Sequence, residues 1–387
     1  MTVEDAPADR FRSPRRPTWI EIDQDALGRN VAAVVSELAG TPLMAVVKAG
    51  AYGHGAVGVA RVALGRGASW VATATVAEAL ELRHDGIAAP ILVFGYTPPE
   101  QVPAAVGGRL AVTVFDEQVL AALDQAGAEQ GRPASAHLKI ETGMNRLGIL
   151  PERTAAFVEA ARRHQHVELE GCYTHFSDGA AAETTRAQLA RFQVALDAAE
   201  AAGHRFRLRH AANSAAWRTV PEARLDLVRC GLELLGLQTP DGRCREPVLS
   251  FRTQVAQVHE ISAGMSVGYG DGFRADRPML VATLPVGYAD GFRRSPQGWG
   301  TVLIGGQERA LLGTSCMDLS MVDASDDPQV QAGDIATLIG VDGSARISAE
   351  VVAQRLGTIN YEVTTGLRGR VPREFLSAGV EVDPEYN

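Results

Sequence analysis

Residues 43–55, LMAVVKAGAYGHG, place a lysine between a short apolar run and a glycine-rich turn. The apolar run at 43–47 is too short for a helix, which predicts a buried strand. Glycines from Gly53 onwards interrupt the pattern, so the strand ends close to Lys48. Barrel and open-sheet α/β enzymes carry their chemistry at that end of their strands. A partly desolvated lysine there can form a Schiff base with an aldehyde, whereas a surface lysine that happens to follow a strand has no such role.

This stretch begins a longer alternating pattern. Between residues 43 and 236, short runs rich in β-branched residues alternate with segments such as 117–129, 152–163 and 183–202, whose apolar spacing and composition favour helices. The predicted strands cover residues 43–47, 70–74, 91–94, 110–114, 136–140, 169–174, 206–211 and 227–234. Strands interleaved with helices in this way predict an α/β fold, and a (β/α)8 TIM-like barrel fits better than an open sheet.

The pattern changes after about residue 245. Runs at 255–258, 279–284, 301–304 and 335–339 look like strands, and glycine-containing turns rather than helices connect them. We therefore expect a disordered N-terminal extension at 1–16, a cofactor-binding barrel at 17–244 and a C-terminal β-rich domain at 245–387. Because the barrel is large enough to fold alone, the second domain is expected to complete a site or an interface.

Composition narrows the class of protein. The 387 residues are 46% hydrophobic and 21% charged, and the net charge is −9 with no basic block beyond residues 10–16. Nucleic acid and anionic membranes are therefore not expected partners. The four cysteines lie far apart, so neither a metal site nor a disulfide framework is expected. The N-terminus is polar and no apolar stretch reaches about 18 residues, from which we expect a cytoplasmic protein.

Unusual polar residues fall at the carboxyl ends of the predicted barrel strands. They are Lys48 after the first strand, Lys139 at the fifth, His175 at the sixth, Asn213 and Ser214 after the seventh, and Arg229 in the eighth. Each alone has an ordinary structural explanation, as a snorkelling cation, a buried histidine or a helix cap. Their convergence on one rim of one barrel favours a shared site.

The same rim offers groups that can bind a phosphate. Ser214 is expected to open a helix, where its hydroxyl and nearby backbone N–H groups would face an anion. Gly231 lets the backbone approach a ligand closely. No G-x-G-x-x-G or G-x-x-x-x-G-K-[ST] pattern occurs, which excludes a dinucleotide or Walker-type site. A phosphate site beside a Schiff-base lysine indicates pyridoxal 5′-phosphate (PLP), whose ring serves as an electron sink.

With these motifs, the chain resembles the alanine racemase family, PLP enzymes with an N-terminal barrel and a C-terminal β-domain. The resemblance runs from about residue 19 to residue 375. Its landmarks are VVKAGAYGHG at 46–55, HLKIETGMNRLG at 137–148, THF at 174–176, HAANS at 210–214, VRCG at 228–231, VGYG at 267–270, LPVGYADGFRR at 284–294, CMD at 316–318 and INYEV at 359–363. Their order and spacing together make the resemblance specific.

The resemblance implies roles for individual residues. The expected PLP site comprises Lys48, Tyr52, His175, Asn213, Ser214, Arg229, Gly231, Leu232 and Tyr361. Lys48 would hold the cofactor as a Schiff base, and Arg229 would donate a hydrogen bond to the pyridine nitrogen. Arg146 and the backbone N–H of Met317 would bind the substrate carboxylate. Lys139 would orient Arg146, in some family members as a carbamylated lysine.

Inverting a stereocentre requires one group that removes the α-proton and another that returns a proton to the opposite face. The resemblance implies that Lys48 and Tyr269 form this pair, with Tyr269 contributed by the partner subunit of a head-to-tail homodimer. A tyrosine in a glycine turn is otherwise often only a hairpin aromatic, and a tyrosine base requires a cationic neighbour. Tyr288, Arg294 and Asp318 are expected in supporting roles, Asp318 by positioning the neighbouring backbone.

Arg229 at the pyridine nitrogen also bears on the type of reaction. A guanidinium hardly ever gives up its proton, so the pyridine nitrogen would stay neutral and the electron sink would be weaker. A shorter-lived carbanion is less exposed to protonation at the wrong carbon. A carboxylate there would favour transamination instead.

The chain departs from the family pattern at Gly50, Glu141, Leu235, Thr314 and Ala180. Family members commonly carry a paired arginine and aspartate where Thr314 and Ala180 stand, in the corridor by which substrate enters. Losing both partners leaves no unpaired charge, so a wider and less polar entrance is expected, in which Arg294 remains.

The main hypothesis is thus a PLP-dependent racemase of alanine. A racemase of serine or of larger amino acids in a specialised pathway is the first alternative, because of the departures in the entrance. A non-catalytic PLP-carrier protein and a PLP amino-acid decarboxylase of the same two-domain plan are further alternatives.

Overall fold

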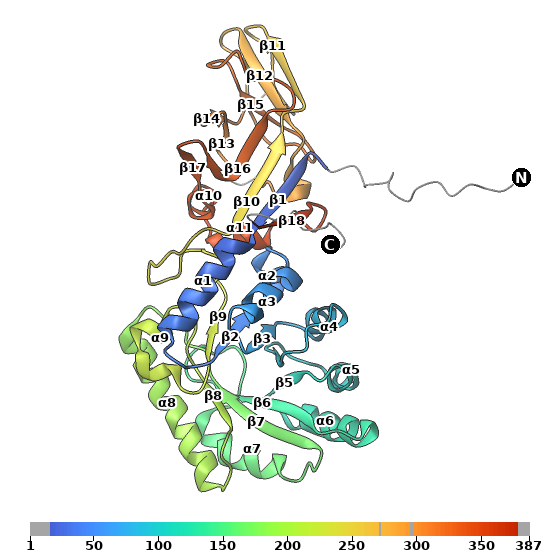
Figure 1. The fold of residues 1–387 in the computed structure, drawn as a ribbon, viewed down its shortest axis with the longest axis vertical. Coiled ribbons are helices and arrows are strands. Elements are labelled where there is room, and N and C mark those ends of the chain that lie inside the picture. Colours follow the sequence, from blue (N-terminus) through green and yellow to red (C-terminus); the bar gives the residue numbers. More distant parts are fainter. Residues whose placement is uncertain (1–15, 271, 295–297, 378–387) are drawn as a thin grey trace, which may run out of the picture. The chain divides into compact units, whose positions relative to one another are not determined.

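A computed structural model describes residues 16–270, 272–294 and 298–377 of the chain (Figure 1). These residues divide into two compact units. The barrel unit contains Asp23–Val248 and Ser377, and the second unit contains residues 16–22 and Leu249–Leu376. The extension expected at 1–16 lies outside the described residues, apart from Arg16. None of the helices that the structure describes is long and apolar enough to span a membrane.

The barrel unit is built on eight strands in the order β8-β7-β6-β5-β4-β3-β2-β9, all paired in parallel. The strands are β2 (Leu43–Val46), β3 (Trp70–Thr73), β4 (Ile91–Val93), β5 (Ala111–Val114), β6 (Ala134–Lys139), β7 (Val167–Tyr173), β8 (Leu208–His210) and β9 (Val228–Cys230). Backbone bonds from Asp226 N–H to Arg209 O (3.0 Å) and from Arg229 N–H to Ala212 O (3.2 Å) join the flanks of β8 and β9. The sheet is therefore a nearly closed barrel, as predicted.

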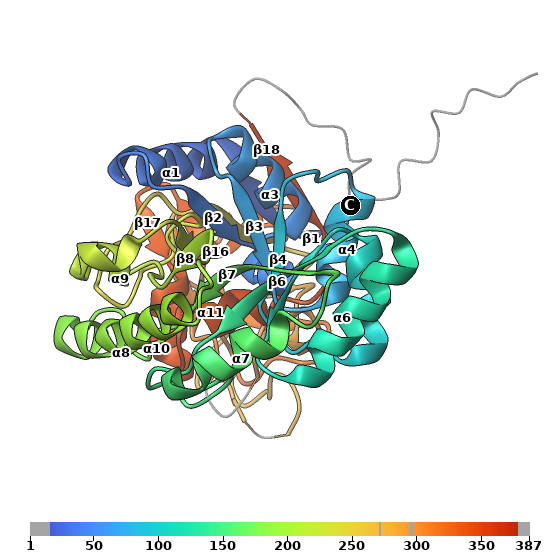
Figure 2. The ribbon, with the colours of Figure 1, turned by 90° about the horizontal axis from the view of Figure 1, so that it is seen from below.

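Helices surround the strands of this sheet (Figure 2). They are α1 (Gln24–Glu37), α2 (Lys48–Tyr52), α3 (Ala56–Gly65), α4 (Val76–His84), α5 (Val102–Gly107), α6 (Glu117–Gln130), α7 (Thr154–Ala161), α8 (Ala182–Ala201) and α9 (Ala216–Thr219), with short 3₁₀ turns η1 (Pro99–Gln101), η2 (Pro151–Arg153) and η3 (Pro221–Arg224). Several of these helices begin at a residue whose side chain accepts hydrogen bonds from the first backbone N–H groups. Asp23 caps α1, Thr75 caps α4 and Asp116 caps α6 in this way.

The second unit is β-rich, as predicted. Its strands are β1 (Thr18–Asp23), β10 (Leu249–Gln254), β11 (Gln257–Ile261), β12 (Met279–Leu284), β13 (Thr301–Ile304), β14 (Gln307–Ala310), β15 (Ser320–Asp323), β16 (Ile335–Asp342), β17 (Ala345–Ile347) and β18 (Arg373–Leu376), and its helical segments are η4 (Tyr288–Asp290), α10 (Ala349–Leu356) and α11 (Asn360–Thr365). One sheet has the order β14-β13-β16-β10-β1-β18, with β17 paired to β16, and a second has the order β11-β12-β15.

Two features of this unit differ from expectation. The strand predicted at 255–258 is only half strand, because residues 257–258 begin β11 whereas Val255 and Ala256 connect β10 to β11. Val255 N–H donates to Asp334 O, and Ala256 N–H donates to Thr283 O. The domain boundaries also differ, because β1 pairs antiparallel with β10 and so belongs to the second unit. No strand was predicted at 18–23, where the structure buries Ile20 and Ile22, and the sequence does not show a partner so distant in the chain.

The turn after β9 gives a stability prediction. Gly236 has φ +69°, and a Cβ there would overlap the carbonyl oxygen of Glu246, whereas Gly242 has φ +82° with no heavy atom within 4 Å. Gly242→Ala is expected to lower the free energy of unfolding by about 1 kcal/mol and Gly236→Ala by about 3 kcal/mol or more, because only the second adds a backbone clash. Chemical denaturation of both variants measures the difference. Equal losses would contradict the close approach at Gly236.

Candidate active site

The carboxyl ends of the barrel strands gather the residues predicted for the cofactor site. Lys139 is the last residue of β6, Arg229 lies within β9, and Lys48 and His175 follow β2 and β7. Their proximity shows in the pKa of His175, which lies well below its usual value, first because of burial and then because of nearby cations. These cations are Arg229, Lys139, Arg146 and Lys48. Such a concentration of positive charge suits a phosphate and a carboxylate as ligands.

Lys48 begins a turn with unusual backbone geometry. The φ angles of Ala49, Gly50, Ala51 and Tyr52 are 52°, 60°, 51° and 54°, so α2 is a left-handed turn. Left-handed geometry costs roughly 1–2 kcal/mol for each residue that has a Cβ, and only Gly50 escapes this cost. Backbone strain of this kind persists where the surroundings hold it, and it clusters at functional sites.

Glu78, on α4, stabilises the turn that follows Lys48. Its carboxylate accepts the Ala49 N–H at 2.7 Å, and the same side chain completes a capping box with Thr75 at the start of α4. The sequence analysis did not include Glu78, although T-x-x-E at 75–78 is a recognisable capping signal. Burial, with the charge of Arg146, lowers the pKa of Lys48, and Glu78 opposes the shift.

Arg229 is buried among acceptors that carry no negative charge. Its Nη1 donates to His210 Nδ1 (3.0 Å), and its Nη2 donates to the carbonyl oxygens of Thr174 (2.8 Å) and Ala211 (2.9 Å). A longer contact of 3.4 Å joins Nη2 to His175 Nδ1. Burial lowers the pKa of Arg229 to about 10, so the guanidinium remains protonated at neutral pH.

Three predicted phosphate-site residues come together beside β9. The Gly231 N–H donates to Ser214 Oγ at 3.2 Å, and a Cβ on Gly231 would lie 2.8 Å from the Tyr52 hydroxyl oxygen. A side chain at position 231 would therefore displace the Tyr52 ring. Leu232 follows directly and is buried.

Ser214 does not open a helix, contrary to the prediction. The helix α9 begins at Ala216, and its first turn is held by Asn213, whose Oδ1 accepts the N–H groups of Ala215 (3.2 Å) and Ala216 (3.0 Å). Asn213 therefore fixes the backbone of the turn, and the Ser214 hydroxyl is the group that faces Gly231.

Lys139 and Arg146 lie near each other at the same rim. Within the described residues no hydrogen bond links the Lys139 amine to Arg146, whose backbone N–H instead donates to the Glu141 carboxylate at 3.2 Å. The Lys139 Nζ lies 4.9 Å from the centre of the Tyr173 ring. Burial, followed by the charge of Arg229, lowers the pKa of Lys139 to about 7.

The second unit carries Tyr269 and Met317 outside its helices and strands. Tyr269 is 72% exposed and Met317 is 53% exposed. The backbone joins two of the predicted segments, because Tyr288 N–H donates to Cys316 O (3.1 Å) and Ala289 N–H donates to Met317 O (3.0 Å). Tyr288 and Met317 therefore share one loop cluster.

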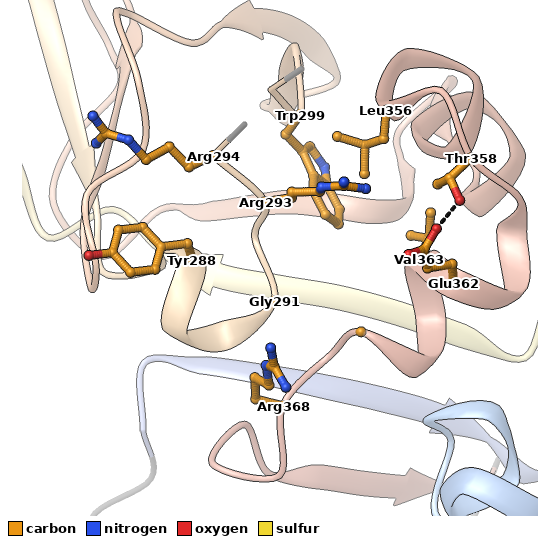
Figure 3. A pocket seen from close by; sticks show the side chains of 11 residues that line it. Tyr288, Gly291, Arg293, Arg294, Trp299, Leu356, Thr358, Glu362, Val363 and Arg368 are labelled. Atoms are coloured by element: carbon orange, nitrogen blue, oxygen red, sulfur yellow. Dashed lines mark hydrogen bonds between the residues drawn. The ribbon is translucent and has the colours of Figure 1, made fainter. Parts of the chain in front are cut away.

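The supporting residues of this unit have defined contacts. Arg294 donates to Ser315 O at 2.9 Å and lines a cavity of about 440 Å³ together with Tyr288 (Figure 3). The Asp318 carboxylate accepts from Arg370. Among the hydrogen bonds of the described residues, none joins it to the backbone of Met317, which it was expected to position. Tyr361, in α11, is half-buried, and burial raises its pKa.

The barrel rim fits PLP by three observations. A primary amine with a lowered pKa, Lys48, can attack an aldehyde. A buried guanidinium, Arg229, supplies donors without a neutralising carboxylate. Gly231 packs against Tyr52 and donates its N–H to Ser214 Oγ, so two hydroxyl groups that can bind a phosphate lie beside one backbone N–H.

Comparison with known proteins agrees with this geometry. The family model described as alanine racemase, N-terminal domain, matches residues 22–239, and the model of the C-terminal domain matches residues 248–375. An alanine racemase of Symbiobacterium thermophilum is 42% identical over 366 residues, which cover 93% of this chain and 97% of the relative.

Solved structures give the same result. An alanine racemase from Bacillus anthracis with bound L-Ala-P has a TM-score of 0.90 and 34% identity, and the match covers 95% of this chain and 97% of that one. An alanine racemase from D-cycloserine-producing Streptomyces lavendulae has a TM-score of 0.89 and 37% identity, with 96% and 99% covered.

These matches define the class as a PLP-dependent isomerase with a barrel domain. The chain belongs to the alanine racemase family, and both domains of the family are present.

The chain contains only two lysines, Lys48 and Lys139, and the structure places both at the rim. Protein labelled with ¹³Cε-lysine, in carbon-dioxide-free buffer, should show a Lys139 signal that titrates near pH 7. Burial and the charge of Arg229 both disfavour the protonated amine, so Lys139 is neutral above that pH and protonated below it. Loss of the signal in Lys139→Arg assigns it. Titration near the ordinary value of about 10.4 would contradict the buried environment.

Proposed function

We infer that this protein interconverts L-alanine and D-alanine with PLP bound at the barrel rim. The observation that carries the proposal is the placement of Lys48 and Arg229 at one rim of a chain that matches both racemase domains. The Bacillus anthracis relative with bound L-Ala-P supports alanine as the substrate.

The rim residues can perform the first half of the reaction. Lys48, with its lowered pKa, would bind the cofactor aldehyde and then act as a base on one face of the substrate. When bound, PLP supplies an electron sink that stabilises the α-carbanion. Arg229 would donate to the pyridine nitrogen, while Tyr52, Ser214 and Gly231 would surround the phosphate.

The second base would be Tyr269 of the partner subunit. The exposure of Tyr269 and Met317 is consistent with a surface that a second copy of the chain covers. His175 would stabilise the Tyr269 phenolate by donating a hydrogen bond to it. Its Nδ1 faces the Arg229 guanidinium, which only donates, so Nδ1 is the acceptor nitrogen of the ring. The pKa of His175 is low, so the ring is neutral and its single proton lies on Nε2, which can donate a hydrogen bond.

The substrate carboxylate would bind Arg146 and the backbone N–H of Met317 of the partner subunit. Glu141 holds the backbone of Arg146, which fixes where the guanidinium begins. Arg294 would remain as a charge in the substrate corridor.

A broader racemase is the second candidate, favoured by small uncharged Thr314 and Ala180. The carrier hypothesis does not fit the match of residues 248–375 to the racemase C-terminal domain. The decarboxylase hypothesis does not fit the racemase family to which the chain belongs.

A substrate panel tests the function. Purified protein is expected to racemise L-alanine with a kcat/KM at least about tenfold above those for L-serine, L-lysine and L-arginine. Chiral chromatography measures the products. Borohydride should fix the cofactor on Lys48, with Lys139 unmodified as the internal control. Negligible alanine turnover with rapid turnover of another amino acid would favour the broader racemase.

Mixing two variants tests the shared site. Lys48→Ala and Tyr269→Phe chains should each be nearly inactive, because each lacks one base at every site. After subunit exchange in equal amounts, half of the dimers are mixed and each has one intact site, so about a quarter of wild-type activity should return. If both bases came from one chain, exchange would restore nothing. A monomer at assay concentration, measured by sedimentation, would exclude the arrangement.

A further inference from the structure

Two buried histidines lie inside the barrel, and the steps proposed above do not use them. His137, on β6, and His210, the last residue of β8, are fully buried, and His137 Nδ1 lies 2.9 Å from His210 Nε2. Tyr173 stacks on His210 with ring centres 4.8 Å apart and planes 3° apart. Trp70 meets His137 edge-on at 5.5 Å. Both imidazole rings are therefore held in fixed orientations.

The backbone is adapted to His137. The register between β6 and β7 shifts between Ala136 and His137. Gly171, on β7, lies against the ring, and a Cβ at this glycine would overlap His137 Nδ1. An irregular ladder and a glycine inside a buried strand both weaken a sheet, so the barrel tolerates two local costs to accommodate one imidazole.

The position of each imidazole proton follows from Arg229. A guanidinium only donates, so His210 Nδ1 accepts from Arg229 Nη1. Burial and the charge of Arg229 hold the pKa of His210 well below its usual value, so the neutral ring carries its proton on Nε2. That proton is donated to His137 Nδ1. Burial lowers the pKa of His137 to about 3, so this ring is also neutral with its proton on Nε2.

The chain of donors points at a carboxylate. His137 Nε2 lies 3.7 Å from Glu170 Oε1, and among the described residues it has no hydrogen-bond partner. Glu170 also contacts the Ser135 hydroxyl and the Arg207 guanidinium. Its carboxylate is therefore held in place beside the last N–H of the chain.

Glu170 lies at the amino end of the barrel, opposite the proposed active site. It lines a cavity of about 520 Å³ together with the first residues of three strands, Trp70, Ile91 and Ala111. The Arg229–His210–His137–Glu170 chain thus crosses the barrel interior from one end of the strands to the other.

We propose that Glu170 and His137 are positioning residues that hold the Arg229 guanidinium through His210. The Glu170 charge favours the His137 tautomer whose Nε2–H faces it, which leaves His137 Nδ1 as an acceptor for His210. His210 Nδ1 then stays an acceptor for Arg229 Nη1, so the guanidinium keeps one orientation. The effect on catalysis rests on the proposed function, in which Arg229 donates to the pyridine nitrogen.

A charge-only change at Glu170 tests the proposal. Glu168 lies on the same strand but is exposed, so Glu168→Gln is the matched control for Glu170→Gln. Glu170→Gln should lower kcat for alanine by about threefold to tenfold and raise the dissociation constant of PLP by about threefold, with KM unchanged within about twofold. Glu168→Gln should change none of these. Equal effects of the two variants would overturn the proposal.

The tautomers provide a readout that needs no substrate. In ¹⁵N-histidine-labelled holoenzyme, His137 and His210 should both be neutral with the proton on Nε2 between about pH 6 and pH 9. Glu170→Gln should shift the His137 signals most and those of His210 less. A proton on Nδ1 of either ring would overturn the chain of donors even if alanine racemisation is confirmed. An inactive protein with both protons on Nε2 would instead count against the proposed function alone.

A double-mutant cycle distinguishes an effect transmitted through His137 from an unrelated structural effect of the Glu170 substitution. His137→Phe keeps a ring of similar size and removes both nitrogens, so adding Glu170→Gln should cause no further loss of kcat. If the two substitutions acted independently, their fold-losses of kcat would multiply in the double variant. If His137→Phe does not fold, the comparison of Glu170→Gln with Glu168→Gln still decides the proposal.

Discussion

A buried guanidinium that cannot release its proton is the constraint on which the barrel interior depends. Arg229 needs acceptors on several sides, and the barrel provides them at the ends of adjacent strands, where the carbonyls of Thr174 and Ala211 follow β7 and β8. The other acceptors are the Nδ1 atoms of the neutral imidazoles of His210 and His175. Burying a cation among dipoles avoids a neighbouring carboxylate, whose charge would compete with the anionic groups that the site has to bind.

The same positive charge controls the two lysines. Arg146 contributes to the lowered pKa of Lys48, and Arg229 contributes to that of Lys139, in both cases after burial. A lysine among cations keeps more of its amine neutral, which is the form that attacks an aldehyde or accepts a proton. The charge that attracts phosphate and carboxylate therefore also favours the nucleophilic form of Lys48.

Sequence reasoning succeeded where local pattern determines structure and failed where distant contacts do. The strands Met279–Leu284 and Thr301–Ile304 have the predicted bounds, because apolar β-branched runs between turns define them. The partner of β1 and the left-handed φ of Ala49 could not be read, since both depend on contacts elsewhere in the fold. At the rim, Lys48 was identified from its place after a predicted strand and Arg229 from its place within one. The prediction that Ser214 opens the helix was wrong, because Asn213 accepts the N–H groups of its first turn.

Each unit lacks a group that the proposed reaction requires. The barrel rim holds cations and a neutral histidine that can stabilise an anionic oxygen, yet a racemase also needs a base on the opposite face of the substrate. The second unit presents Tyr269 exposed to solvent. An exposed tyrosine without a cationic neighbour requires another surface to bring positive charge to it before it can serve as the second base. A second copy of the chain supplies such a surface without any additional partner, which is why the proposed homodimer and the proposed two-base reaction depend on each other.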